Sequence, residues 1–292
     1  MSQEIKVFHS PDSDDIAMFY AMAVQKPKIV HFGQIRPRRY SFNFTAFDTE
    51  KLNQLALEGV PEVCAVSTGI YEKIKDKYQI LSAGCSVARD SGPKLVVNSN
   101  ISLDELLKEG ATVSVPGFNT TSYKIIKSLY PNLNYLEVPI TPFELVFEKL
   151  RANEVSAAVL IHEGQLTFKN HGLIELMDLV NSYQSINKLP VPLGLTVIRR
   201  DLSEDFKRQF LITLRSSILF SIKNRGLIID YLNKLDNFNN FDVEQLNSYL
   251  DKYVNRDTFA ISDDVLNSLS KLTGLSLPEL NSCIFDYNAG QN

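Results

Sequence analysis

Cysteine is scarce in this chain, and long apolar runs are absent. The 292 residues include three cysteines, Cys64, Cys85 and Cys283. An odd number without paired spacing argues against a disulfide framework and against a zinc module. No stretch approaches the roughly 20 apolar residues that a membrane-spanning helix needs, and the N-terminal residues lack an apolar core of signal-peptide length. We therefore expect a cytoplasmic protein without a membrane partner.

Several well-known motifs are missing as well. The sequence contains no glycine-rich phosphate loop, no dinucleotide fingerprint and no nucleophile elbow. The formal net charge of -4 gives no reason to expect binding to nucleic acid. Arg36, Arg38 and Arg39 form the only basic cluster, which we interpret as a solvated loop face.

Short apolar runs alternate with longer amphipathic segments, which is the pattern of an α/β protein. The predicted strands cover residues 5–8, 62–67, 94–98, 112–115, 135–138 and 195–198, together with the apolar run that ends just before residue 162. The predicted helices cover residues 13–24, 48–58, 69–77, 102–108 and 142–152, and most of the chain from residue 203 onward. Residues 189–194, Leu-Pro-Val-Pro-Leu-Gly, are predicted to form a rigid turn.

Two blocks of strands and helices, joined by two extended crossings, predict two α/β lobes. The larger lobe is expected to hold residues 1–96 plus 197–292, and the smaller lobe residues 97–196. The crossings would then act as a hinge, and a ligand would bind in the central cleft between the lobes.

The most informative segment is the run from Val155 to Gly164, which ends in His162 and Glu163. A short apolar run of this kind is typical of a buried strand. It would place His162 at the carboxyl end of the strand, where open α/β sheets bind their ligands. Histidine changes charge near neutral pH, so His162 is a candidate acid or base. The alternative is a histidine that only bonds nearby backbone.

Residues 117–122 form the second segment of interest, because a strand leads there into Thr120, Thr121 and Ser122 at the opening of a helix. The first backbone N–H groups of a helix have no intrahelical partner, and the helix dipole adds positive potential. Such a helix start binds a carboxylate or a phosphate. Simple N-capping by Asn119 or Thr120 is the alternative.

Two further junctions give weaker signals. Ser67 and Thr68 stand between a strand and a helix, so their hydroxyls either face the cleft or cap the helix. The small-residue turn that contains Ser82 and Gly84 allows backbone to approach a ligand closely. Cys85 lies in the same turn but has no basic partner in the sequence, so we do not interpret it as a nucleophile.

An acidic cluster, Asp12, Asp14 and Asp15, follows the first predicted strand. Clustered carboxylates can bind a metal ion, and they also stabilise a helix N-terminus. Because no wider metal-binding pattern accompanies them, we favour the capping interpretation, with Ser10 or Asp12 as the N-cap, and expect no metal.

Several stretches, taken in order, resemble the 1,4-dihydroxy-6-naphthoate synthase family of the futalosine route to menaquinone. These stretches are Ser10-Pro11 with Asp15, Asp48 to Asn53, Gly92-Pro93, Gly117 with Thr120-Thr121, Leu160 to Glu163, Leu189 to Gly194, Arg199 to Leu202 and Tyr253 to Asn255. They extend over nearly the whole chain. At one point the chain departs from the family, which has Cys-Pro-Asn-Asp where this chain has Asp12-Ser13-Asp14-Asp15. The turn at Gly84 departs from the family pattern as well.

The resemblance implies a two-lobed fold like that of type II periplasmic binding proteins, used as a cytoplasmic enzyme. It implies a carbon–carbon lyase that forms 1,4-dihydroxy-6-naphthoate from cyclic dehypoxanthine futalosine, a small carboxylate substrate, without metal or organic cofactor. His162 would be the general base, and the helix start at Thr120 would hold the substrate carboxylate. The predicted substrate-binding residues are Ser10, Ser67, Thr68, Ser82, Gly84, Asn119, Thr120, Thr121 and Ser122.

Other functions stay open at this point. Chorismate dehydratase of the same route shares the fold, and a solute-binding protein would need an export signal that this start does not show. A ligand-sensing domain would be expected beside a fused output domain, and none is visible. Neighbours on a strand point to opposite faces, so Glu163 is expected to take little part in the site. The sequence does not fix the oligomeric state, and a homodimer is one alternative.

Overall fold

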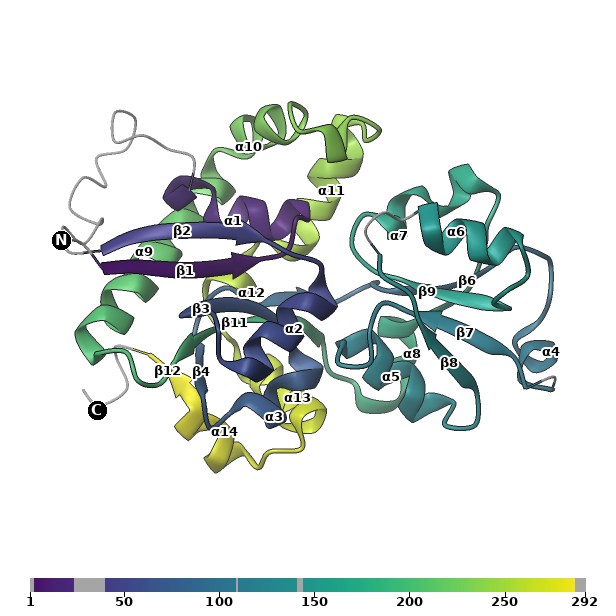
Figure 1. The fold of residues 1–292 in the computed structure, drawn as a ribbon, viewed down its shortest axis with the longest axis horizontal. Helices are drawn as coiled ribbons and strands as arrows, with labels where there is room; N and C mark the ends of the chain where they lie inside the picture. Colours follow the sequence, from purple (N-terminus) through teal and green to yellow (C-terminus); the bar gives the residue numbers. More distant parts are fainter. Residues whose placement is uncertain (1–2, 24–39, 109, 141–143, 287–292) are drawn as a thin grey trace.

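The chain forms two α/β lobes that lie beside one another (Figure 1). A computed structural model describes residues 3–23, 40–108, 110–140 and 144–286. The basic cluster at Arg36, Arg38 and Arg39 lies outside these residues. Within the described part of the chain, no helix is long and apolar enough to cross a membrane.

The larger lobe is built on a seven-stranded sheet with the strand order β12-β4-β11-β3-β1-β2, to which β5 adds by pairing with β11. The strands are β1 (Gln3–His9), β2 (Tyr40–Ala46), β3 (Val63–Ser67), β4 (Tyr78–Leu81), β5 (Ser86–Ala88), β11 (Val191–Arg199) and β12 (Ile284–Phe285). Strands β2, β1 and β3 run parallel, and β11 is antiparallel to β3. The expected strands at residues 5–8 and 62–67 are confirmed.

The smaller lobe is built on a five-stranded sheet with the order β10-β6-β9-β7-β8. Its strands are β6 (Lys94–Val97), β7 (Thr112–Val115), β8 (Asn134–Glu137), β9 (Ala157–Leu160) and β10 (Ile174–Asp178). Strands β8, β7 and β9 run parallel, and β6 is antiparallel to β9. The expected strand before residue 162 is therefore present, and it has a parallel neighbour in β7.

Both lobe boundaries lie a few residues earlier than the sequence indicated. Lys94 pairs with Leu160 in the smaller sheet, so residues 94–96 do not belong with the larger lobe. Val191 pairs with Ala88 in the larger sheet, so residues 191–196 do not belong with the smaller lobe. The rigid turn predicted for residues 189–194 was wrong, because residues 191–194 belong to β11. Pro190 precedes the strand, and Pro192 is accommodated near its start, beside a register shift.

The helices cover the two sheets and agree in outline with the sequence pattern. In the first half they are α1 (Ser13–Ala23), α2 (Thr49–Glu58), α3 (Tyr71–Ile74), α4 (Leu103–Lys108), α5 (Thr121–Leu129) and α6 (Glu144–Arg151), with a 3-10 turn η1 (Thr68–Ile70). In the second half they are α7 (Gly164–Thr167), η2 (Phe168–His171), α8 (Leu179–Asn187), α9 (Glu204–Lys223), α10 (Arg225–Leu232), η3 (Asp236–Phe238), α11 (Val243–Tyr253), α12 (Arg256–Phe259), α13 (Asp263–Thr273) and α14 (Leu277–Cys283). The expected helix at 69–77 is broken into η1 and α3.

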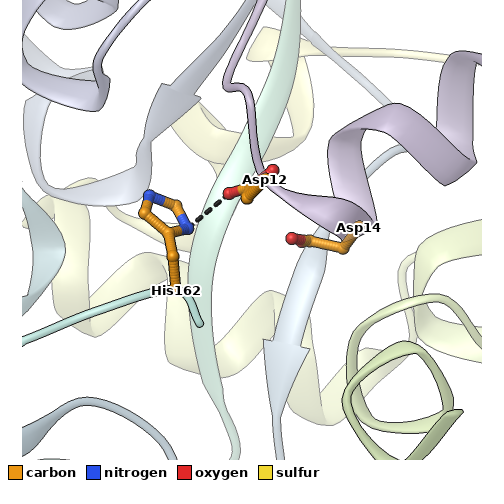
Figure 2. Close-up of side chains that lie close together, drawn as sticks. All are labelled: Asp12, Asp14 and His162. Atoms are coloured by element: carbon orange, nitrogen blue, oxygen red, sulfur yellow. Dashed lines mark ion pairs between the residues drawn. The ribbon is translucent and has the colours of Figure 1, made fainter. Parts of the chain in front are cut away.

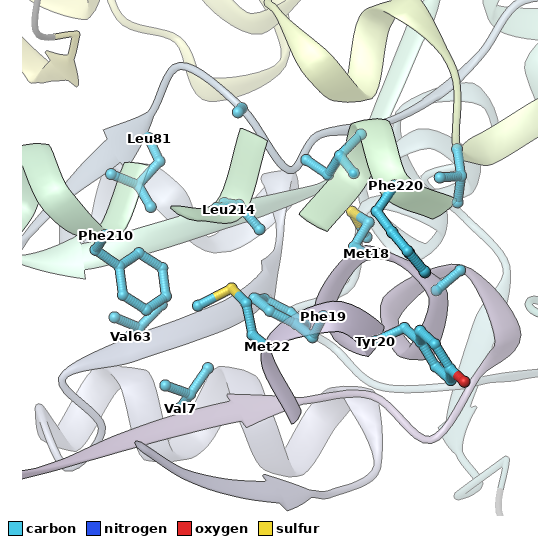
Figure 3. Close-up of a cluster of buried hydrophobic side chains, with 14 of the residues drawn as sticks. Val7, Met18, Phe19, Tyr20, Met22, Val63, Leu81, Phe210, Leu214 and Phe220 are labelled. Atoms are coloured by element: carbon cyan, nitrogen blue, oxygen red, sulfur yellow. The ribbon is translucent and has the colours of Figure 1, made fainter. Parts of the chain in front are cut away.

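Both faces of the larger sheet are buried. Along β3, Val63 faces one apolar cluster whereas Cys64 and Val66 face another, as the alternation of a strand requires. Figure 3 shows the first cluster, in which Phe210 and Leu214 of α9 approach Val63 and residues of α1. Burial on both faces explains why β3 is a nearly continuous apolar run.

The topology brings the carboxyl ends of the parallel strands to the cleft. In the larger lobe, Asp12 follows β1, Thr49 follows β2 and Ser67 ends β3. In the smaller lobe, Thr120 follows β7 and His162 follows β9. All five residues line one cavity between the lobes, which is the place where α/β sheets bind their ligands.

Candidate active site

The cavity between the lobes is small, with a volume of about 90 Å³. Its walls combine apolar side chains, such as Leu52 and Ile161, with the rings of Tyr249 and Tyr253 from α11. Ligand pockets generally measure about 300–1,000 Å³, so this is a cleft with its lobes shut. A second hollow of about 630 Å³ meets it at Ser10, Asp12, Thr49 and His162.

His162 lies just beyond β9, in a turn, with a φ of 52°. Residues other than glycine seldom adopt this left-handed conformation, and such strain is often found at functional sites. The ring Nε2 lies 2.7 Å from the Thr49 hydroxyl, and Nδ1 forms an ion pair with the Asp12 carboxylate (Figure 2). Both partners belong to the larger lobe, so the ring is held from across the cleft.

The carboxylates around His162 differ in charge. Burial raises the pKa of Asp14 and Asp15 well above the usual value, and repulsion from Asp12 adds to the effect. Burial also acts to raise the pKa of Asp12, but the attraction of His162 outweighs it and lowers that pKa. In this closed cleft Asp12 is therefore the ionised member of the cluster.

The ionisation of His162 follows from the same balance. Burial acts to lower the pKa of His162, but the adjacent Asp12 carboxylate raises it to about 10. At neutral pH the closed cleft therefore holds Asp12 and His162 as an ion pair, while burial favours the protonated forms of Asp14 and Asp15.

Among the described residues, one group has ligand atoms within 4.8 Å of one another, which is near enough to share a cation. This group is Asp12, Asp14 and His162. However, the imidazole and the Asp12 carboxylate contact each other directly. A cation would have to displace that ion pair, and we assign no metal to these side chains. The capping interpretation of Asp12 is also satisfied, because its Oδ1 accepts from the Asp15 N–H at 3.2 Å.

The start of α5 forms the opposite wall of the cavity. Thr120 is the N-cap, and its hydroxyl accepts from the Tyr123 N–H. The Thr121 hydroxyl donates to Leu193 O at 2.6 Å, and it accepts from the Gly69 N–H at 3.1 Å. These hydroxyls are therefore held by the protein, while the first N–H groups of α5 have no intrahelical partner. The capping alternative is thus confirmed for Thr120, and anion binding at this helix start stays a prediction.

Further hydrogen bonds across the cleft keep the lobes together. Glu163 of the smaller lobe accepts from the Ser13 N–H at 2.8 Å and from its hydroxyl at 2.6 Å. Glu50 of the larger lobe accepts from both the backbone and the side-chain amide of Asn119. The strand argument that set Glu163 aside was wrong, because Glu163 lies in a turn beyond β9 and is buried.

Most of the residues predicted for the site line the cavity, namely Ser10, Ser67, Gly84, Thr120, Thr121, Ser122 and His162. Thr68, Ser82 and Asn119 do not line it. Thr68 is buried at the start of η1. Ser82 accepts a bond from Arg215, and Asn119 bonds Glu50 and Lys73. Local spacing could not reveal these tertiary partners.

Sequence reasoning missed several lining residues. Thr49 stands at the first position of α2, where a hydroxyl is commonplace and gives no special signal. Tyr249 and Tyr253 recur at helical spacing on α11, which is also the pattern of an ordinary core helix. They reach the cleft because the C-terminal helix α11 packs against it, and local sequence does not reveal that packing.

Known proteins resemble this chain in sequence. Residues 5–276 match the family model described as menaquinone biosynthesis. A 1,4-dihydroxy-6-naphtoate synthase from Thermus thermophilus is 31% identical over 185 residues, which are 63% of this chain and 65% of that protein. The match thus spans slightly less than two thirds of the length of that relative.

Solved structures show a similar fold. A protein from Archaeoglobus fulgidus is 36% identical, with a TM-score of 0.82, and the match covers 93% of this chain and 96% of that one. A Candida albicans gene product with the generic periplasmic binding protein fold has a TM-score of 0.65 at 13% identity, over 97% of this chain and 96% of its own. The predicted two-lobed, periplasmic-binding-protein-like α/β fold is confirmed, and the chain belongs to the menaquinone biosynthesis family.

Proposed function

We propose that the chain is a 1,4-dihydroxy-6-naphthoate synthase, a lyase that converts cyclic dehypoxanthine futalosine to 1,4-dihydroxy-6-naphthoate and works in the cytoplasm. Family membership and the name of the Thermus relative support the assignment. The observation that carries it is the placement of His162 and the start of α5 on one cavity with apolar and aromatic walls. Such a cavity suits a flat carboxylate with an acidic C–H bond.

The helix start orients the substrate and His162 performs the proton transfer. The substrate carboxylate binds at the first N–H groups of α5, which offer unpaired donors and positive potential. The substrate C–H then points at Nε2 of a neutral His162, in the place where the Thr49 hydroxyl lies. The proton moves from carbon to Nε2. The electron pair left behind forms a ring double bond as the carbon–carbon bond breaks, and the ring becomes aromatic. The electron pair of the broken bond leaves with the sugar-derived fragment, which takes up a proton from water as it is released.

The closed state of the cleft serves this chemistry. The cavity of about 90 Å³ is smaller than most ligand pockets and continues into the larger hollow at His162, so the lobes open for binding and close around the substrate less tightly than in this structure. Closure removes water, which would otherwise protonate the carbanion-like intermediate. The hollow of about 630 Å³ on the other side of His162 gives the expelled fragment room to leave.

The test is to mix the purified protein with cyclic dehypoxanthine futalosine and to follow naphthoate formation by chromatography. The wild-type protein should form product, and His162→Gln should form at least about 100-fold less. Lys108→Gln, a change at an exposed lysine of α4 in the same lobe, is the control and should retain activity. Turnover of chorismate instead of futalosine would assign the protein to the dehydratase and overturn the proposal.

A further inference from the structure

His162 and the two side chains that hold its ring come from opposite lobes. The ring belongs to the smaller lobe, whereas Asp12 and Thr49 belong to the larger one. Building on the function proposed above, we infer that Asp12 is a positioning residue, and that lobe closure assembles the base by bringing the Asp12 carboxylate onto Nδ1 of His162. The base is then complete only when the substrate is enclosed.

The Asp12 carboxylate is fixed before the lobes meet. It lies between β1 and α1, and its Oδ1 accepts from the Asp15 N–H at 3.2 Å. Asp15 is fixed in turn, because it accepts from the Ser10 N–H at 2.7 Å. The remaining oxygen, Oδ2, is the one that faces His162. The loop after β1 thus presents one carboxylate oxygen to the smaller lobe without needing to rearrange.

Adjacent residues keep the two lobes in register. Asp12 pairs with His162, and the next residue on each side, Ser13 with Glu163, pairs as well. The Ser13–Glu163 contact joins the N-terminal end of α1 to the turn that carries the histidine. Because the two pairs are consecutive in both chain segments, closure that forms one pair also aligns the other.

Closure changes the proton affinity of the imidazole. The titratable groups that line the two hollows meeting at the ring are Asp12, Asp14 and Asp15 at the start of α1, Asp48 beside Thr49, Glu163 in the same turn, Tyr249 and Tyr253 of α11, and Glu144, His171 and Asp236. Asp12 contacts the ring directly and contributes most to raising the pKa of His162, while Glu163 and Asp14 add smaller effects. In an open cleft the attraction of Asp12 is lost, and the pKa of His162 falls toward the ordinary value of about 6.5.

This difference gives closure a role in the reaction. At pH 7.5 an open cleft presents a neutral imidazole, which can accept a proton. Closing around the substrate brings Asp12 to the Nδ1–H, so the ring becomes a stronger base in contact with the substrate C–H. The proton passes from carbon to Nε2, the C–H electron pair stays on the substrate, and Asp12 remains ionised. Reopening removes Asp12, and the imidazolium releases the proton to water.

The decisive experiment is an NMR titration of His162, which does not depend on turnover. The chain has four histidines, and His162→Gln identifies the signal. Titrations compare the wild type with Asp12→Asn, with and without saturating 2-naphthoate as the probe of the closed cleft. Without 2-naphthoate, with it, or in both cases, the pKa of His162 should be at least about two pH units higher in the wild type than in Asp12→Asn. Agreement within half a pH unit in both states would overturn the inference.

A variant whose lobes cannot close tests whether the contact between Asp12 and His162 depends on closure. A Cβ on Gly117 would lie 2.2 Å from Oε2 and 2.6 Å from Cβ of Glu50, across the cleft. Gly117→Ala therefore holds the lobes apart while Asp12 stays in place. His162 should titrate near 6.5 in this variant, and a value as high as in the wild type would contradict the role of closure.

The activity assay adds a second readout. Asp12→Asn should lower kcat by about 100-fold or more with a smaller change in KM, and Asp12→Glu should restore part of the loss. If no variant and no wild type turns over futalosine, the proposed function fails while the NMR result still stands. If wild type and Asp12→Asn are equally active across pH 6–10, the positioning role fails and the proposed function stands.

Discussion

Glu163 of the smaller lobe accepts two hydrogen bonds from Ser13 of the larger lobe, one from the backbone and one from the hydroxyl. A replacement of the serine removes the hydroxyl bond and leaves the backbone bond intact. The closed cleft should then be about 1 kcal/mol less stable relative to the open cleft. Ser13→Ala should therefore raise KM about fivefold, as measured by steady-state kinetics with the futalosine substrate.

The control for this variant is another serine–glutamate contact. The Ser102 hydroxyl donates to Glu105 at 2.8 Å, but this pair is exposed and lies within one lobe. Ser102→Ala should leave KM unchanged. An equal rise in KM for both variants would show that the Ser13 bond has no special part in closure.

Gly117→Ala should impair closure at the other contact between the lobes, where Glu50 leaves no space for a methyl group. Small-angle X-ray scattering with saturating ligand should give a larger radius of gyration than for the wild type, and kcat/KM should fall at least about tenfold. Gly226→Ala, at a helical glycine with nothing within 4 Å of the added carbon, should change neither quantity. A Gly117→Ala protein that scatters like the wild type would contradict the steric argument.

Asp14 makes stability fall as pH rises. Burial raises its pKa well above the usual value, so the folded state keeps a proton that the unfolded state loses above about pH 4. Unfolding is therefore favoured progressively as pH rises from about 4 toward the folded-state pKa. Asp14→Asn removes this linkage, so its Tm relative to the wild type should increase between pH 4 and pH 8.

Differential scanning calorimetry across this pH range provides the measurement. Asp230→Asn, at an exposed aspartate, makes the same change in formal charge and should show no such trend. A constant Tm difference between Asp14→Asn and the wild type would mean that Asp14 is ionised in the folded protein.

Phe210 anchors α9 in the core of the larger lobe. Its side chain is fully buried, and its ring packs edge-on against Phe42 with the centroids 5.6 Å apart. Phe210→Ala should lower the free energy of unfolding by about 3–5 kcal/mol, as measured by urea denaturation. Ile212→Ala, at a partly exposed position on the same helix, should cost much less, and similar losses would contradict the assigned core.

Periodicity was enough to predict the lobes, because a buried strand must be a short apolar run and a covering helix an amphipathic one. The strand before His162 and the helix start at Thr120 were found in this way, and the parallel pairing of β9 with β7 explains why they meet. Residues 189–194 failed because proline suggests a turn, while the start of β11 tolerates it beside a register shift.

The partners of the site residues were beyond the reach of local sequence. Asp12 was recognised as a helix cap, and it is one, but its second oxygen bonds a residue 150 positions later. Thr49 gave no signal because a hydroxyl at a helix start is commonplace, and Glu163 was set aside because it was taken as part of a strand. Each of these contacts crosses the cleft, so it depends on how the two lobes dock and on no pattern within either lobe.

The position of β11 has a consequence for how the protein is made. This strand lies between β3 and β4 in the larger sheet, yet it comes after the whole smaller lobe in sequence. During synthesis the smaller sheet is therefore complete before the strand that joins β3 to β4 has left the ribosome. Until then both strands present unpaired edges, which attract other extended chains. A chain that ends near residue 190 would contain a complete smaller lobe and an incomplete larger sheet with exposed strand edges. We expect such fragments to aggregate.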